Sequence, residues 1–300
     1  MLHGNETEAL LQNLICSQVE KNYPFAIYRL PNKDRISVVA QNSSNIYTLQ
    51  NLEGMAGESG FLIAPFAPND RTPIIWIKPD ITDLSFFQKD HTKSLRVKFE
   101  RGRKLREMTK KRFSRYLQYA RRAIKSGKID KVVIARAIHM PFPENFNLAA
   151  FFLKICDTYE WSFVNLFFIP GKGIWAGASP ELLLGYSQGE FTTYSLAGTL
   201  PKYQLKKQKQ KWTIKEKKEQ EIVSSYIKQV VSAYPEVKLM LAGPETVEAG
   251  NIIHLRTIFS IKNIPHFYWT ELVETLHPTP AVAGFPRKSN TNHRKLGRKQ

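Results

Sequence analysis

The sequence has few cysteines and no long apolar run. Only Cys16 and Cys156 occur among 300 residues, too few for a disulfide framework or a multi-cysteine zinc module. The longest apolar stretch, near residues 163–170, has the length of a strand, whereas a membrane-spanning helix needs roughly 18–20 residues. The N-terminal residues carry carboxylates where a secretory signal carries basic residues. These absences predict a cytoplasmic protein that has no membrane partner.

Acidic residues are also scarce, because 44 Lys and Arg stand against 26 Asp and Glu, a net charge of +18. Residues 89–128 hold 16 basic and three acidic side chains, and residues 202–218 hold eight Lys and one Glu. Such stretches could neutralise the phosphates of a nucleic acid. However, the chain has neither zinc-finger spacing nor an RNP-type aromatic motif. Within residues 105–125 the basic side chains fill the outer positions of a helix whose apolar positions are Phe113, Leu117, Ala120 and Ile124. A solvated helix face is therefore favoured, and no nucleic-acid partner is predicted.

Segments typical of strands outnumber those typical of helices. Helices are expected over residues 1–22, 105–126, 148–159 and 212–234. Strands are expected over residues 25–30, 35–41, 45–52, 60–66, 73–80, 131–140, 162–170, 173–179, 181–187, 190–198, 237–243, 252–263 and 266–276. Many strands with few helices between them predict an α+β fold, in which large, mostly antiparallel sheets pack together with helices on the outside.

Two charged residues stand beside apolar runs. Lys131 directly precedes Val132, Val133 and Ile134, and a lysine pointing inward there would be desolvated and available as a neutral base. Glu181 lies between a proline and three leucines, and a carboxyl group against apolar walls has a raised pKa and can serve as a general acid. The alternative for each is an ordinary exposed charge at the end of a strand.

A pair of glutamates lies three residues apart in the fourth predicted helix. This spacing places Glu216 and Glu219 on one face, as two carboxylates that face Mg²⁺ would be, and Glu221 off that face. The alternative is a helix surface of mixed charge. His254 and His277 could donate hydrogen bonds to a hydroxyl or carboxylate, although an isolated histidine is more often structural. The sequence contains no Walker A loop, dinucleotide fingerprint, HExxH or GxSxG motif.

Taken together, six segments resemble the chorismate-utilising enzymes, and within them the isochorismate synthases. They occur in the family's order over some 158 residues. They are DKVVIAR (130–136), GASPELLL (177–184), LAGT (196–199), KEKKEQEIV (215–223), AGPETVEAGNIIHLRT (242–257) and LHPTPAVAGFPR (276–287). Each is weak alone, whereas the ordered set is highly specific. The N-terminal third is a softer match to the shorter isochorismate synthases of menaquinone pathways.

The resemblance implies a reaction in which water enters C2 of chorismate while the C4 hydroxyl leaves. It makes Lys131 the base that activates water and Glu181 the acid that protonates the leaving hydroxyl. It makes Glu219 a ligand of Mg²⁺, the implied cofactor, with Glu216 its neighbour in the metal region and Gln220 in place of the family's usual histidine. It also implies substrate contacts at Ala197, Gly198, Thr199, His254, Ala281 and Val282. The implied partner is chorismate, bound by a monomer.

Two alternatives stay open: a salicylate-forming enzyme, and a catalytically dead chorismate-binding remnant. The resemblance divides the chain into an N-terminal β-rich part (1–90), a chorismate-binding core (91–286) and a basic, unstructured tail (287–300). The family continues for several dozen residues beyond its HPTPAVAGFPR segment, whereas here the apolar content falls at Arg287. We therefore expect a C-terminal truncation or frameshift, an incomplete core, and low or absent metal binding and turnover.

Overall fold

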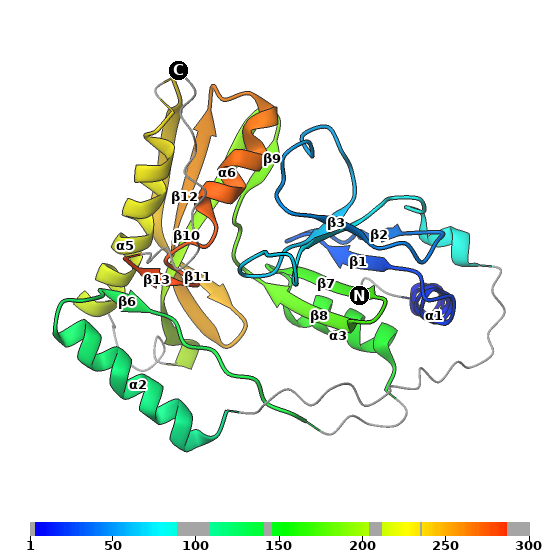
Figure 1. Ribbon diagram of the computed structural model, residues 1–300, viewed down its shortest axis with the longest axis horizontal. Coiled ribbons are helices and arrows are strands. Elements are labelled where there is room, and N and C mark those ends of the chain that lie inside the picture. Colours follow the sequence, from blue (N-terminus) through cyan, green and yellow to red (C-terminus); the bar gives the residue numbers. More distant parts are fainter. Residues whose placement is uncertain (1–3, 89–107, 141–145, 204–211, 235, 287–300) are drawn as a thin grey trace.

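The computed structural model describes residues 4–88, 108–140, 146–203, 212–234 and 236–286. Figure 1 shows two assemblies of sheet and helix side by side, with helices on the outside. Every pair of neighbouring strands in the described residues is antiparallel. The predicted α+β architecture with antiparallel sheets is therefore confirmed.

The first assembly is built on a sheet of order β2-β1-β7-β8. Its strands are β1 (Phe25–Arg29), β2 (Ile36–Ala40), β7 (Phe163–Ile169) and β8 (Gly173–Ser179). The helices α1 (Asn5–Glu20) and α3 (Leu148–Thr158) share one apolar core with this sheet. Because β1 pairs with β7, strands from both sides of the boundary expected at residue 90 share one sheet. The division into domains stays a prediction.

A smaller sheet of order β3-β5-β4 belongs to the same assembly. Its strands are β3 (Tyr47–Leu49), β4 (Phe61–Ile63) and β5 (Ile74–Ile77), and the short helix η1 (Leu84–Phe87) follows. Ile77 is buried in a cluster with Ala26 and Val39 of the larger sheet, and Phe61 packs against that cluster. The strands predicted in the N-terminal third are therefore present.

The second assembly is built on a sheet of order β11-β12-β10-β9. Its strands are β9 (Gly185–Ser187), β10 (Glu190–Pro201), β11 (Lys238–Ala249) and β12 (Ile252–Lys262). The helices α5 (Ile214–Val231) and α6 (Trp269–Leu276) cover it, with η2 (His266–Tyr268) leading into α6. Val223 and Ile227 of α5 pack with Phe259 of β12 and Leu272 of α6 in one core.

The strand predicted over residues 266–276 is wrong, because the segment forms η2 and α6. Its aromatic and β-branched residues are typical of strands, but Trp269, Leu272, Val273 and Leu276 recur at helical spacing. Leu272 and Leu276 are fully buried on the side of α6 that faces α5. Packing of that apolar stripe outweighs the local preference for strand.

The strand predicted over residues 131–140 is also wrong for most of its length. Only β6 (Lys131–Val132) forms, paired with β13 (Gly284–Phe285). Beyond it the described chain offers no neighbouring strand, and Ile138 and Met140 are 62% and 81% exposed. Similarly, only the last three residues of the strand predicted at 181–187 form β9.

The basic helix is α2 (Lys110–Lys125), shorter at its start than the predicted range. The side chain of Thr109 caps it by accepting a hydrogen bond from the Arg112 amide, and Gly127 at φ 68° ends it. None of its residues is buried, so its apolar stripe is only partly covered. The tail predicted at residues 287–300 lies outside the described residues.

Candidate functional site

Lys131 points into the molecule from β6, where its side chain is 10% exposed. Its Nζ donates a hydrogen bond of 2.8 Å to the carbonyl oxygen of Pro280 and lies 3.2 Å from a carboxylate oxygen of Glu219. Its surroundings are therefore polar, although the apolar residues that follow it in sequence suggested apolar walls. Val132 and Val133 are themselves exposed.

Glu181 lies in the segment between β8 and β9. The hydroxyl of Thr279 donates to its Oε1 at 3.5 Å. Burial raises the pKa of Glu181, and the positive charge of Lys131 and the Thr279 hydrogen bond offset this only in part. The direction is the one predicted from its apolar neighbours, so the carboxyl group retains its proton to higher pH than an ordinary glutamate.

The predicted metal-binding carboxylates lie on the face of α5 that turns towards the sheet. Glu216 is buried, accepts a hydrogen bond from the hydroxyl of Thr213 and forms an ion pair with Lys215. The Thr213 hydrogen bond is the main cause of its lowered pKa. Glu219 is partly exposed and pairs with Lys131. Glu221 is exposed, off this face, as its spacing predicted.

Gln220 anchors this part of α5 to the sheet. Its side-chain nitrogen donates to the carbonyl oxygen of Ser195 in β10 at 2.9 Å and to the Thr257 hydroxyl in β12 at 3.1 Å. The side chain is buried. It therefore fixes the position of the neighbouring Glu219 relative to these two strands.

A bulge in β10 lies on the other side of the predicted site. The register between β10 and β12 shifts between Ala197 and Thr199, and Thr199 lies opposite His254. Their side chains share a hydrogen bond of 3.0 Å between Oγ1 and Nδ1. Burial lowers the pKa of His254, opposed in part by a Gly198 backbone hydrogen bond and the charge of Glu219. His254 is therefore mainly neutral at pH 7.

Gly198 lets β10 approach α5 closely. Its φ is 71°, and a Cβ there would lie 3.1 Å from the Cβ and the carbonyl oxygen of Glu216. Gly171 has the same φ of 71°, but nothing lies within 4 Å of its Cβ position. An alanine would therefore introduce the same backbone strain at either position. Only at Gly198 would its methyl group also contact a neighbouring element.

Gly198→Ala is expected to destabilise the protein more than Gly171→Ala. Left-handed backbone costs about 1–2 kcal/mol for either alanine, and overpacking against α5 adds about 1–3 kcal/mol at Gly198. Urea unfolding of both variants measures the difference. Equal losses of unfolding free energy in the two variants would show that α5 moves to accommodate the added methyl group without cost.

The structure brings most of the predicted residues into one network. Lys131 contacts Glu219, and electrostatic interactions join Lys131 to Glu181 and Glu219 to His254. Ala197, in contrast, is buried in the apolar core. Ala281 packs against that core, and Val282 is exposed.

Thr279 and Pro280 were not among the site residues predicted from the sequence. Both lie in the loop between α6 and β13, and they contact Glu181 and Lys131, respectively. The available signal was the stiff double-proline stretch itself, because a rigid loop can hold a hydroxyl and a carbonyl group in place.

Within the described residues, no group of three or more His, Cys, Asp or Glu side chains is arranged to hold a metal ion. The two carboxylates on α5 nevertheless fit Mg²⁺, because this ion is commonly bound through one or two carboxylates together with substrate oxygens and water. Glu216, with its lowered pKa, stays ionised over a wide pH range. Glu216 and Glu219 are thus the side chains that would hold the metal.

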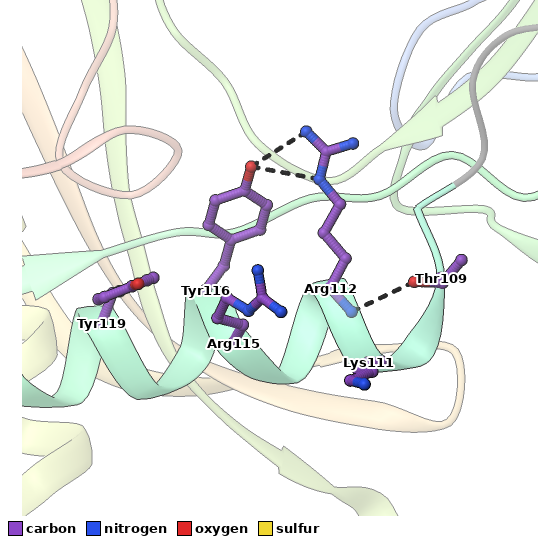
Figure 2. A pocket seen from close by; sticks show the side chains of 6 residues that line it. All are labelled: Thr109, Lys111, Arg112, Arg115, Tyr116 and Tyr119. Carbon is purple, nitrogen blue, oxygen red and sulfur yellow. Dashed lines mark hydrogen bonds between the residues drawn. The ribbon is translucent and has the colours of Figure 1, made fainter.

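A separate hollow lies on α2 and is shown in Figure 2. The guanidinium of Arg112 donates to the Tyr116 hydroxyl at 3.3 and 3.4 Å. The hollow is lined by Thr109, Lys111, Arg112, Arg115, Tyr116 and Tyr119. Its lining contains no carboxylate and none of the predicted catalytic side chains.

The chain is similar to known proteins of one family. Residues 64–294 match the family model described as chorismate binding enzyme. Since this match covers more than half of the chain, the protein belongs to the chorismate binding enzyme family. Among the described residues, no helix is long and apolar enough to cross a membrane.

Within this family, the relatives that the chain resembles are isochorismate synthases. It is 26% identical over 168 residues to the vibriobactin-specific isochorismate synthase of Vibrio cholerae, covering 54% of this chain and 42% of that protein. It is 24% identical over 184 residues to the salicylate biosynthesis isochorismate synthase of Pseudomonas aeruginosa, covering 56% and 36%, respectively. The matched segments therefore span less than half the length of these relatives.

The fold resembles that of MenF, the menaquinone-specific isochorismate synthase from Escherichia coli. The TM-score is 0.64 at 20% sequence identity, and the match covers 95% of this chain and 73% of that one. The predicted chorismate-utilising fold is therefore confirmed.

Proposed function

We propose that this protein is an isochorismate synthase. The observation that carries the proposal is that a lysine and a protonatable carboxyl group, Lys131 and Glu181, are hydrogen-bonded to two consecutive residues of one loop, Pro280 and Thr279, respectively. Lys131 takes a proton from the water that attacks C2 of chorismate. Glu181 gives its proton to the C4 hydroxyl, which leaves as water while the ring double bond shifts. One water is consumed and one is released, so the product is an isomer.

The other residues of the network bind the substrate. Neutral His254 and Thr199 offer hydrogen bonds to a substrate hydroxyl or carboxylate, and Gly198 beside them lets β10 approach α5 closely. We further propose that Ala197 contributes only backbone atoms, because its side chain is buried in the core. Ala281 and Val282 form the floor of the site. Mg²⁺, when bound by Glu216 and Glu219, would neutralise one carboxylate of the dianionic substrate.

The first experiment incubates the purified chain with chorismate and Mg²⁺ and separates the products by chromatography. Isochorismate supports the proposal. Salicylate with pyruvate would instead establish the salicylate-forming alternative, whose support is the similarity to the Pseudomonas enzyme of salicylate biosynthesis. Binding of chorismate without any product would establish a catalytically dead remnant.

Glu219→Gln is expected to weaken Mg²⁺ binding by tenfold or more, because the substitution removes the charge of a metal ligand while keeping its size. Glu221→Gln is the matched control, since Glu221 lies on the same helix but is exposed and off the metal-binding face. Calorimetric titration with Mg²⁺ in the presence of chorismate measures both. If the two variants bind Mg²⁺ alike, Glu219 is not a ligand.

We also propose that the enzyme acts in menaquinone biosynthesis, as a monomer in the cytoplasm. The menaquinone assignment is supported by the similarity of its N-terminal third to the shorter enzymes of that pathway. A monomer is the simplest arrangement because every residue of the proposed site comes from one chain. Neither cysteine forms a disulfide, as expected in a reducing compartment. Complementation of a bacterial strain that lacks its menaquinone-specific isochorismate synthase tests the pathway, and light scattering tests the oligomeric state.

A further inference from the structure

We infer that the Thr279–Pro280 dipeptide sets the relative position of the two reacting groups, and that the Thr279 hydroxyl is a positioning residue for Glu181. This inference rests on the proposed function, because it concerns the same acid and base. It assigns a role to two residues that do not themselves contact the reacting atoms of the substrate.

The dipeptide contacts both groups through adjacent atoms of one chain segment. The Thr279 hydroxyl lies 3.5 Å from Oε1 of Glu181, and the carbonyl oxygen of Pro280 accepts a hydrogen bond of 2.8 Å from Nζ of Lys131. Thr279 is only 4% exposed, and Pro280 is buried as well. Since one peptide unit separates the two contacts, the dipeptide limits how far the acid and the base can move apart.

The loop that carries the dipeptide is held at both ends. On one side, the His277 amide donates to the carbonyl oxygen of Val273 in α6 at 2.9 Å. On the other side, β13 pairs with β6, with Phe285 opposite Lys131. Between them, the amides of Val282 and Ala283 donate to the carbonyl oxygen of Thr279 at 3.1 and 3.0 Å. The loop is thus a closed turn that is bonded to the strand of the base.

Gly284 allows this close approach to β6. A Cβ at Gly284 would lie 2.5 Å from the carbonyl oxygen of Lys131, a distance that real Cβ atoms do not reach. The strand that carries the base and the loop that carries the dipeptide therefore touch through their backbones. A side-chain rearrangement alone cannot separate them.

The structure also defines the charged groups around Glu181, which the Thr279 hydroxyl contacts. The charged group that faces Glu181 is Lys131 from β6. Behind it, Glu219 of α5 pairs with Lys131 and acts electrostatically on His254 of β12. Within the described part of the chain, the Thr279 hydroxyl supplies the one side-chain hydrogen bond to the Glu181 carboxyl group. Without that donor, the carboxyl group can rotate away from the proton-donating orientation.

Thr279→Val tests this role because it removes the hydroxyl and keeps the shape. We expect kcat to fall about tenfold, because the variant loses a hydrogen bond to an ionisable group. KM is expected to change by less than about twofold. Thr279→Ser restores the hydroxyl and is expected to recover kcat to within about twofold. Ser17→Ala is the control for the loss of a buried hydroxyl. Ser17 of α1 is 6% exposed, and its hydroxyl accepts a hydrogen bond from Lys21 and contacts neither catalytic group.

A second measurement does not depend on turnover. The titration of the Glu181 carboxyl is followed by carbon-13 NMR of labelled glutamate and assigned by its loss in Glu181→Gln. Thr279→Val is expected to shift that titration to higher pH, whereas Thr279→Ser and Ser17→Ala leave it unchanged. A titration and a kcat of Thr279→Val equal to those of the parent would overturn the inference. If the parent forms no isochorismate, the proposed function fails, and the titration alone decides whether Thr279 positions Glu181.

Discussion

Glu181→Gln is expected to lower kcat for isochorismate formation by about 10²- to 10⁴-fold, the usual contribution of a general acid. Glutamine has the same size and can still accept from Thr279, but it has no acidic proton to give to the leaving hydroxyl. KM is expected to change little, because the substituted group acts on a bond that breaks only in the transition state. Product chromatography under saturating chorismate measures the loss.

The pH dependence of the parent enzyme follows from the same carboxyl group. A general acid works in its protonated form, and burial raises the pKa of Glu181 above the usual value. The activity that depends on Glu181 is therefore present at low pH and lost as the pH rises through that raised pKa. Glu181→Gln is expected to remove this limb of the profile, and Glu181→Asp, which keeps an acid one methylene shorter, is expected to retain it with lower kcat.

Stability provides the control for this experiment. A carboxyl group whose pKa is raised on folding contributes stability that is fully present below its unfolded pKa and lost as the pH rises through its folded pKa. At pH 8 a neutral glutamine thus spares the cost of burying a charge, offset by the lost attraction to Lys131. We expect Glu181→Gln to unfold at a temperature no lower than the parent does at pH 8. A variant that stays folded and keeps more than a tenth of the parental kcat would contradict the assignment of Glu181 as the acid.

The features of this site that could be predicted from sequence are those set by local spacing. Glu216 and Glu219 lie on one face of α5 because three residues separate them, and the raised pKa of Glu181 agrees with its apolar neighbours. The contact of Lys131 with Pro280 joins residues 149 positions apart. It depends on the pairing of β6 with β13, two strands of two residues each, which carry almost no periodic signal.

The errors in the fold have a related cause. Residues 266–276 have the composition of a strand, and this composition masks the helical spacing of Leu272 and Leu276, which pack in the core. Residues 131–140 have the apolar content of a strand, but a strand also needs a neighbour. Local sequence does not show whether a neighbouring strand is present, so this second assignment required the three-dimensional structure.

Arg29→Met is expected to lower the free energy of unfolding by about 3–5 kcal/mol, the largest effect on stability among the substitutions considered. Arg29 lies at the end of β1 and is only 2% exposed. Its guanidinium donates to the carbonyl oxygens of Tyr159 at 2.6 Å and Glu160 at 2.8 Å. It also donates to those of Leu30, Lys33, Cys156 and Ser162.

The physical reason lies at the end of α3. Cys156 belongs to the last turn of this helix, so its carbonyl group has no amide of a further turn to bond to. The charge of Arg29 suits the negative end of the helix dipole. Methionine has a similar length and fills the space. The carbonyl groups of Tyr159, Glu160 and Leu30 keep a backbone amide as donor, but the carbonyl groups of Cys156 and Ser162 lose Arg29, at a cost of about 1–3 kcal/mol for each unsatisfied group.

Urea unfolding followed by circular dichroism measures the effect. Arg29→Lys is expected to lose less, because an ammonium group keeps the charge but cannot reach both sides of the carbonyl cluster as a planar guanidinium does. Arg71→Met is the matched control, since Arg71 is exposed, and is expected to stay within about 0.5 kcal/mol of the parent. If Arg29→Met unfolds within 1 kcal/mol of the parent, water must reach these carbonyl groups. The join between β1 and α3 would then depend on the apolar packing of Phe25 and Phe152.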